Sequence, residues 1–252
     1  MLQYADQLTP HDGLRLIQQH LPLQYDHLCR YAPKGSTRSR SALLWQLPVV
    51  RSVKPEQLAG RDANHFIPKP KPLPASSPPI GGGSKGDFRV YSVTPIRPLT
   101  NNTWSFTIDG LVERPVTYNW ETFIKLKRKV QISDFHCVTG WSVYKNTWEG
   151  LSLKQLLEQA GVKSGATHIK FYSADGVYTD SLTLEQARMD DVMVAMLHDG
   201  ILIPSELGGP VRLIVPKMYA YKSVKWLNRI ELIDMDHVGY WEQRGYSKDA
   251  WV

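Results

Sequence analysis

The chain has 252 residues, of which 42% are apolar and 21% are charged, a composition typical of globular proteins. Its length fits one large domain, or one domain with an extension. No segment approaches the ~18 consecutive apolar residues that cross a bilayer, so we expect a protein that is not embedded in a membrane. The two cysteines, Cys29 and Cys137, exclude a disulfide framework and any C-x-x-C zinc or iron–sulfur site.

The net charge of +6 is concentrated in the first third of the chain. Residues 1–80 carry ten lysines and arginines against five acidic residues, whereas residues 81–252 carry twenty against nineteen. A nearly neutral main part does not support a nucleic-acid-binding surface across the protein. The first 30 residues have no basic start followed by an apolar core, so we expect no secretory signal and a cytoplasmic setting.

Proline marks a domain boundary. Eleven of the 17 prolines lie in residues 1–80, and six of them fall between Pro68 and Pro79. Because proline fixes φ and lacks a backbone donor, this segment predicts an extended, solvated linker. Upstream, residues 12–21 fit one short helix. We therefore predict a basic, proline-rich N-terminal extension and linker over residues 1–83, with a small partner-docking module as an alternative, and a folded domain over residues 84–252.

Three elements are predicted early in the domain. Residues 104–108 alternate apolar and polar side chains, as in a half-buried strand, and Asp109-Gly110 is expected to close that strand with a turn. Residues 121–129 have apolar residues at helical spacing and predict a helix. Residues 130–138 predict a strand, with Cys137 at its C-terminal end.

Two short helices follow, each opened by the same signal. Ser152 and Gln155 form a predicted capping box, because the serine hydroxyl can accept from the Gln155 amide while the glutamine side chain reaches back. That helix is expected to end at Gly161, a good left-handed cap, and Thr183 to Gln186 repeats the start signal. Buried strands are predicted at Ile169–Tyr172, Val192–Leu197, Val211–Val215 and Ile230–Ile233. Strands and short helices without strict alternation predict an α+β fold with mixed sheets.

Phosphate-loop and histidine–zinc sites find no support. The sequence contains no G-x-x-x-x-G-K-[ST] motif, which would cradle a nucleotide phosphate. Its eight histidines lack H-x-x-x-H spacing, which argues against a histidine-ligated zinc.

Cys137 is the first candidate for chemistry, in the segment S-D-F-H-C-V-T-G-W-S. An inert, buried cysteine is one interpretation. A thiolate nucleophile is a second, although the adjacent His136 would point to the opposite face of a strand and is poorly placed as its base. A metal-ligating thiolate is a third, and a lone cysteine then needs a cofactor that brings its own sulfurs.

A second candidate is the segment from Pro210 to Arg229, which contains no acidic residue. Gly208-Gly209 precedes it and allows close backbone approach to a ligand. Its cations are Arg212, Lys217, Lys222, Lys225 and Arg229. A solvated basic face is one interpretation, but cations beside a strand of Val, Leu and Ile favour a partly enclosed anion site, because charged hydrogen bonds to phosphate are strong. Stacking on RNA has less support, since no acid-free basic stretch of this kind continues elsewhere in the domain.

A cysteine that needs a sulfur-bearing cofactor and a separate phosphate-type segment both fit molybdopterin. Residues 87–252 resemble the short sulfite-oxidase-like oxidoreductases of bacteria, within the sulfite oxidase superfamily of molybdenum enzymes. More distantly, they are similar to the catalytic subunit of the molybdenum-dependent methionine sulfoxide reductase. The motifs that carry the resemblance are D-F-H-C-V-T-G-W-S, W-E-G, G-G-P-V-R-L-I-V-P, Y-K-S-V-K-W-L and G-Y-W-E-Q-R-G-Y.

The resemblance implies a sulfite-oxidase-type molybdopterin-binding fold and a mononuclear molybdenum oxidoreductase. Such an enzyme transfers an oxygen atom to or from a small substrate, such as an S-oxide or another oxyanion, and exchanges electrons with a separate heme or quinone-linked partner. Cys137 is the implied molybdenum ligand. The implied cofactor contacts are Asp87, Val90, Tyr91, Cys137, Ser173, Leu207, Arg212, Ser223, Val224 and Lys225. Lys217, Tyr219 or Trp241 is expected to shape the substrate entrance.

Two features depart from the family pattern. Relatives usually carry histidine or asparagine at the position of Leu207, whose side chain cannot form hydrogen bonds. The arginine-rich C-A-G-N-R type of active site is absent, which argues against sulfite as the substrate. Two alternatives therefore stay open: a non-catalytic molybdopterin- or anion-binding protein, and a hydrolase that uses Cys137 as its nucleophile.

Overall fold

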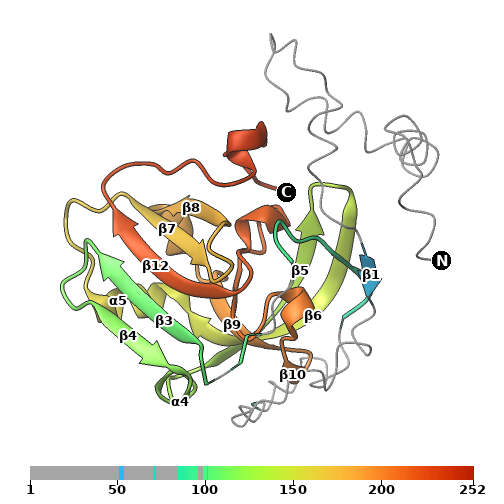
Figure 1. Ribbon diagram of the computed structural model, residues 1–252, viewed down its shortest axis with the longest axis horizontal. Coiled ribbons are helices and arrows are strands. Elements are labelled where there is room, and N and C mark those ends of the chain that lie inside the picture. Colours follow the sequence, from blue (N-terminus) through green and yellow to red (C-terminus); the bar gives the residue numbers. More distant parts are fainter. Residues whose placement is uncertain (1–50, 54–70, 72–83, 96–98, 101) are drawn as a thin grey trace.

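The computed structural model describes residues 51–53, 71, 84–95, 99–100 and 102–252, and Figure 1 shows two groups of strands side by side. The predicted helix at residues 12–21 lies outside the described residues. So does the predicted linker from Pro68 to Pro79, except for Lys71.

The first sheet contains β3 (Ser105–Gly110), β4 (Val116–Asn119), β7 (His168–Ser173), β8 (Thr179–Thr183) and β12 (Leu227–Ile233). Its strand order is β4-β3-β12-β7-β8. The central strand β12 runs parallel to β3 and antiparallel to β7, and the outer pairs are antiparallel. The sheet is therefore mixed, as predicted.

The second sheet contains β5 (Lys129–Cys137), β6 (Trp141–Ser152), β9 (Met193–His198), β10 (Ile201–Leu202) and β11 (Arg212–Ile214). Its order is β10-β9-β6-β5, and β11 also pairs with β9. All of these pairs are antiparallel. The predicted strands at residues 130–138, 192–197 and 211–215 are confirmed to within a residue or two.

The helices are short: α4 (Trp120–Phe123), α5 (Leu153–Ala160) and α6 (Leu184–Ala187), with 3-10 turns η3 (Ser205–Leu207), η4 (Ala220–Lys222) and η5 (Glu242–Arg244). The predicted cap of the third helix is confirmed in full, and that of the second in part, since only the bond from the Gln155 amide to Ser152 is present and Gly161 has a positive φ but not a left-handed helical ψ. Ser152 accepts from the Gln155 amide and Gly161 ends α5 with φ 71°, while both bonds of the capping box are present at the start of α6. Among the described residues, no helix has the length and apolar character to cross a membrane.

Two sequence predictions are wrong. The helix expected over residues 121–129 is only the single turn α4, because Ile124 and Leu126 pack against the core from an irregular segment instead. Asp109-Gly110 does not close a turn. It forms the end of β3 and pairs with Glu231 and Leu232 of β12, and the chain leaves the strand at Gly110, whose φ is 79°, so the turn follows this pair.

Alternating side chains place the main core between the two sheets. Residues from both sheets belong to this cluster, among them Phe106, Ile108, Leu151, Ile169, Val194, Met196, Leu213 and Ile230. A smaller cluster covers the other face of the second sheet, where β9 contributes Met193 and Ala195. The period of two in β9 thus divides its side chains between two cores. The α+β class with mixed sheets is confirmed.

Residues before position 84 add two contacts to the domain. Strand β1 (Arg51–Val53) pairs antiparallel with β2 (Phe88–Val90), and Figure 1 shows β1 at the edge of the domain near β6. The Lys71 amide donates to Glu149 Oε2 at 2.9 Å, and Glu149 is buried beside Arg128. The boundary at residue 83 stays a prediction, but part of the chain before it contacts the folded domain.

Candidate functional site

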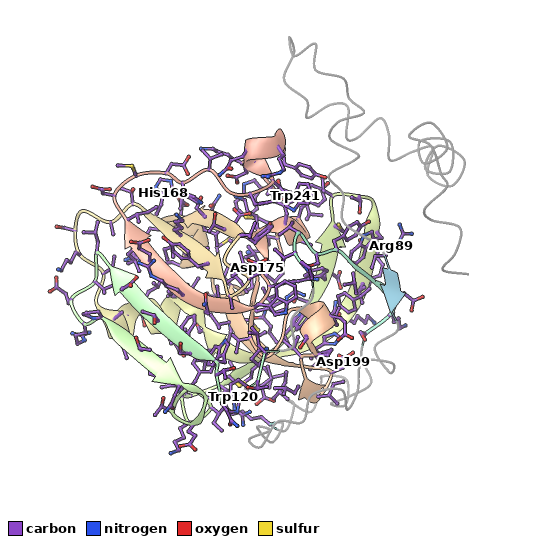
Figure 2. The ribbon with its side chains drawn as sticks, viewed as in Figure 1. Arg89, Trp120, His168, Asp175, Asp199 and Trp241 are labelled. Atoms are coloured by element: carbon purple, nitrogen blue, oxygen red, sulfur yellow. The ribbon has the colours of Figure 1, made fainter. Side chains whose placement is uncertain are left out.

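A cleft lies where the ends of several strands meet, and it contains about 910 Å³ of empty space including its mouth. Cys137 and Ser173, the last residues of β5 and β7, both line it. Figure 2 labels three further lining residues: Arg89 from β2, Asp175 from the turn after β7, and Trp241 from the C-terminal segment. The cleft therefore draws on both sheets and on segments far apart in the chain.

Cys137 occupies the tip of the β5–β6 hairpin. It pairs with Trp141 across the hairpin, and its carbonyl accepts from the Gly140 amide at 2.9 Å. Its Sγ lies 3.2 Å from Thr139 Oγ1. Burial is the main cause that raises the pKa of this thiol, opposed by the hydrogen bonds from Thr139. A thiol in this setting becomes a thiolate only with further stabilisation, such as a metal ion provides.

His136 does not act on Cys137. Its Nδ1 lies 2.8 Å from Ser142 Oγ, and its ring packs edge-on against Tyr144. Adjacent residues on β5 point to opposite faces, as the sequence analysis expected. The neighbouring histidine is therefore not placed to be the base of a cysteine hydrolase.

Arg212 is a buried cation in the wall of the cleft. It donates to the carbonyls of Leu207 at 2.6 Å and Ser223 at 3.0 Å, and its guanidinium lies 4.9 Å from the centre of the Phe135 ring. Its Nε is buried and has no hydrogen-bond partner among the residues that the structure describes. Burial lowers its pKa to about 9, so the side chain stays charged at neutral pH.

Lys225, in the segment between η4 and β12, lines the same cleft as Arg212. Its Nζ donates to the carbonyls of Tyr91 at 2.8 Å and Glu206 at 2.9 Å. Burial, and then repulsion from Arg212, lowers its pKa to about 7. Gly208, at φ 96°, makes this approach possible, because a Cβ there would lie 2.6 Å from Lys225 Cβ and Cγ.

The structure brings together most of the predicted site residues. Those that line the cleft are Tyr91, Cys137, Ser173, Leu207, Arg212, Ser223 and Lys225. Leu207 contributes its backbone carbonyl to Arg212 rather than a side-chain hydrogen bond. The side chains of Asp87, Val90 and Val224 are not in the lining: Asp87 is exposed and the two valines belong to the cores. Their contacts with a cofactor stay a prediction.

Of the three residues expected at the entrance, Trp241 lines the cleft. Lys217 and Tyr219 do not line it, and Lys217 instead pairs with Asp191 at 3.5 Å. The sequence reasoning missed Arg89, Thr139, Asp175, Tyr178 and Tyr246. Thr139 could have been found from its place two residues after Cys137, since a tight turn returns its hydroxyl toward the thiol.

A buried ionic cluster supports the wall behind Trp241. The Lys222 ammonium of η4 donates to Asp180 Oδ1 of β8 at 2.8 Å and to Glu242 Oε1 of η5. All three side chains are at most 4% exposed. The cluster thereby joins η4, which precedes Ser223, to the C-terminal segment that carries Trp241.

The cluster makes stability depend on pH through Asp180. Burial raises the pKa of Asp180 from 3.8 to about 7, against the attraction of Lys222. Between pH 3.8 and about 7, the folded protein therefore keeps a proton on Asp180 that the unfolded chain releases. This contribution to the free energy of unfolding is complete below pH 3.8 and is lost as pH rises through about 7. We expect the free energy of unfolding of the wild type to fall between pH 5 and 8 relative to Asp180→Asn, by at most about 1.4 kcal/mol per pH unit. Urea unfolding of both proteins across this range tests it, and parallel curves would contradict it.

Comparison with known proteins gives consistent matches. The model of the oxidoreductase molybdopterin binding domain matches residues 92–241. The uncharacterized oxidoreductase YuiH of Bacillus subtilis (strain 168) is 34% identical over 150 residues, which cover 59% of this chain and 75% of YuiH. The protein-methionine-sulfoxide reductase catalytic subunit MsrP of Ralstonia nicotianae is 29% identical over 175 residues, covering 64% of this chain and 51% of MsrP.

A solved structure agrees at the level of the fold. The sulfane dehydrogenase SoxCD from Paracoccus pantotrophus superposes with a TM-score of 0.55 and 22% identity, over 80% of this chain and 57% of that chain. The chain thus spans three quarters of YuiH and about half of MsrP. With the family model covering most of the described domain, the chain belongs to the oxidoreductase molybdopterin-binding family and is a sulfite-oxidase-like oxidoreductase that uses the molybdenum–molybdopterin cofactor.

Proposed function

We propose that this oxidoreductase holds a single molybdenum through the thiolate of Cys137 and transfers an oxygen atom to or from a small substrate such as an S-oxide. One observation carries the proposal. Cys137 lines the same cleft as the buried Arg212 and the half-buried Lys225, two basic side chains that donate hydrogen bonds to backbone carbonyls. A soft ligand for a metal and cations for a phosphate are the two groups that molybdopterin needs.

The cleft fits an anionic cofactor. Its lining contains three cations, Arg89, Arg212 and Lys225, against one carboxylate, Asp175. Arg212 is only 2% exposed, so its charge would act on an anion in the cleft from within a poorly solvated wall, where electrostatic attraction is strong. We infer that Arg212 and Lys225 hold the phosphate side of the cofactor.

When bound, the cofactor supplies two-electron oxygen-atom-transfer chemistry. In this proposal, Cys137 holds the metal at the hairpin tip and the cations fix the opposite end of the cofactor. Trp241 and Tyr246, whose rings lie 5.2 Å apart, wall the mouth and limit access of water. Ser173 contributes a hydroxyl to the lining of the same cleft.

The substrate class rests on the relatives. MsrP is named for the reduction of methionine sulfoxide in proteins, and an S-oxide is the substrate we propose for this chain. Purified protein from a host that makes the cofactor is expected to contain about one molybdenum per chain and to reduce a methionine S-oxide with an artificial electron donor. Sulfite oxidation with an artificial acceptor is the competing assay. A folded protein that binds no molybdenum would overturn the proposal, and turnover of sulfite alone would overturn the substrate class.

We further propose that electrons come from a separate heme or quinone-linked protein. MsrP is named a catalytic subunit, which supports a division of labour between the molybdenum protein and an electron donor. Reduction of the isolated protein should then need an artificial donor, and a physiological partner should replace that donor in a reconstituted assay.

Replacing Arg212 with Met tests the proposed phosphate contact. Charge-assisted hydrogen bonds contribute about 1.5–3 kcal/mol, so we expect cofactor affinity to fall by roughly 10- to 100-fold. Pterin content, measured by the fluorescence of its oxidised form, and metal content should fall together. Arg229→Met is the matched control, because Arg229 of β12 pairs with Asp109 of β3 and is not in the cleft lining. Equal cofactor content in the two variants would contradict the assignment.

A further inference from the structure

A chain of hydrogen-bonding groups leads from the cleft wall to the sulfur of Cys137. The Tyr91 hydroxyl lies 3.2 Å from Thr139 Oγ1, and the same Thr139 oxygen lies 3.2 Å from Cys137 Sγ. Thr139 is 9% exposed. The three side chains come from two segments, the residue after β2 and the tip of the β5–β6 hairpin.

The surroundings hold this chain in place. The Tyr91 ring stacks on Trp141 with an interplanar angle of 9° and a centroid distance of 6.4 Å. The Tyr91 carbonyl accepts from Lys225 Nζ at 2.8 Å. At the other end, the Gly140 amide closes the turn onto the Cys137 carbonyl. Both hydroxyl-bearing residues are therefore held by backbone and ring contacts that do not involve their hydroxyl groups.

Once Cys137 is a thiolate, the available hydroxyl protons decide which group donates in each of these two hydrogen bonds. A thiolate sulfur only accepts hydrogen bonds, so the single hydroxyl proton of Thr139 must point to it. The Thr139 oxygen then has lone pairs alone to offer Tyr91, and the tyrosine hydroxyl must donate to it. Each hydrogen bond polarises the next, so the Tyr91 donor strengthens the bond from Thr139 to the sulfur.

We propose that Thr139, supported by Tyr91, is a positioning residue that sets the reduction potential of the metal bound by Cys137. This inference rests on the proposed function, because it needs Cys137 to be the metal ligand. A hydrogen bond to a ligating sulfur withdraws electron density from it, and such bonds are a recognised means by which proteins tune metal potentials. A sulfur that donates less favours the reduced metal, so the Thr139 hydroxyl raises the potential of the one-electron Mo(VI)/Mo(V) couple.

The test compares purified, cofactor-loaded variants. Thr139→Val removes the hydroxyl and keeps the shape, Thr139→Ser keeps the hydroxyl, and Tyr91→Phe removes only the second donor. Thr147→Val is the matched control, since Thr147 lies in the same hairpin, is buried, and has a hydroxyl without a partner among the described residues. The readouts are the midpoint potential, from an EPR-monitored redox titration, and the energy of the sulfur-to-molybdenum absorption.

We expect Thr139→Val to lower the midpoint potential and to move the absorption to longer wavelength. Tyr91→Phe should shift both in the same direction by a smaller amount, and Thr139→Ser and Thr147→Val should match the wild type. An unchanged potential and band in Thr139→Val would overturn the inference while leaving the proposed function intact. If that variant fails to load cofactor, Tyr91→Phe decides on the same criterion. A wild-type sulfur-to-molybdenum band that persists unchanged in loaded Cys137→Ala would instead show that the proposed ligand is wrong, and both proposals would fall.

Discussion

Replacing Cys137 with alanine is expected to abolish turnover and to remove the part of the sulfur-to-molybdenum absorption that comes from the cysteine thiolate. The reason is specific to the sulfur: alanine keeps the hairpin turn, whose Gly140 amide binds the backbone carbonyl of residue 137, but supplies no thiolate. Arg212 and Lys225 are untouched, so the pterin should remain bound to a substantial extent. Absorption spectroscopy, pterin fluorescence and metal analysis on one preparation separate these effects.

The sequence provides a matched control for this experiment. Cys29 is its only other cysteine, and Cys29→Ala should retain the absorption and the rate of the wild type. A Cys137→Ala protein that keeps both its absorption band and its turnover would show that the metal takes its thiolate elsewhere. Loss of the band in Cys29→Ala would point to that residue instead.

Replacing Lys222 with methionine is expected to produce the largest loss of stability among the substitutions considered. It leaves Asp180 and Glu242 buried, with the ammonium that joined them gone. Removing one partner of a buried ionic cluster costs about 3–5 kcal/mol, because the remaining charge is desolvated without compensation. Urea unfolding should show this loss as a lower midpoint with an unchanged slope.

The effect should extend to the cleft, since the same ammonium joins η4 to the C-terminal segment. We expect Trp241 fluorescence and cofactor retention to change in Lys222→Met. Lys154→Met is the control, because Lys154 also pairs with an aspartate, Asp190, but does so at an exposed site where an ion pair adds little. Equal stability of the two variants would contradict the structural role of the buried cluster.

The sequence predicted most elements whose signals are local. The caps of α5 and α6 depend on side chains within three residues of the helix start, and both were found. Strand β6 was missed over its 12 residues, because its inner positions include Asn146 and Glu149, which read as solvent-exposed. Asn146 donates to the Val143 carbonyl, and Glu149 accepts from the Lys71 amide and forms an ion pair with Arg128, partners that no alternation pattern reveals.

The residues of the candidate site also divide into those with a signal in the sequence and those without one. Cys137 and Arg212 were found because a lone cysteine and an acid-free cationic segment are unusual in themselves. Thr139 and Tyr246 were not found, since a threonine or tyrosine in a sequence carries no sign of what it will face. Lys222 was grouped with the anion-binding cations, but tertiary contacts give it two buried carboxylates and a structural role.

The strand in the middle of the first sheet is the last one in the sequence. Hairpins β3–β4 and β7–β8 can pair locally, but β12 must enter between them before the sheet has a continuous ladder. During synthesis the domain therefore cannot close until residue 233 has left the ribosome, and the nascent chain carries open strand edges until then. Trp226 lines the cleft and directly precedes β12, so completing the sheet also completes the cleft wall. A complete cleft wall therefore requires β12 to be in place between the two hairpins.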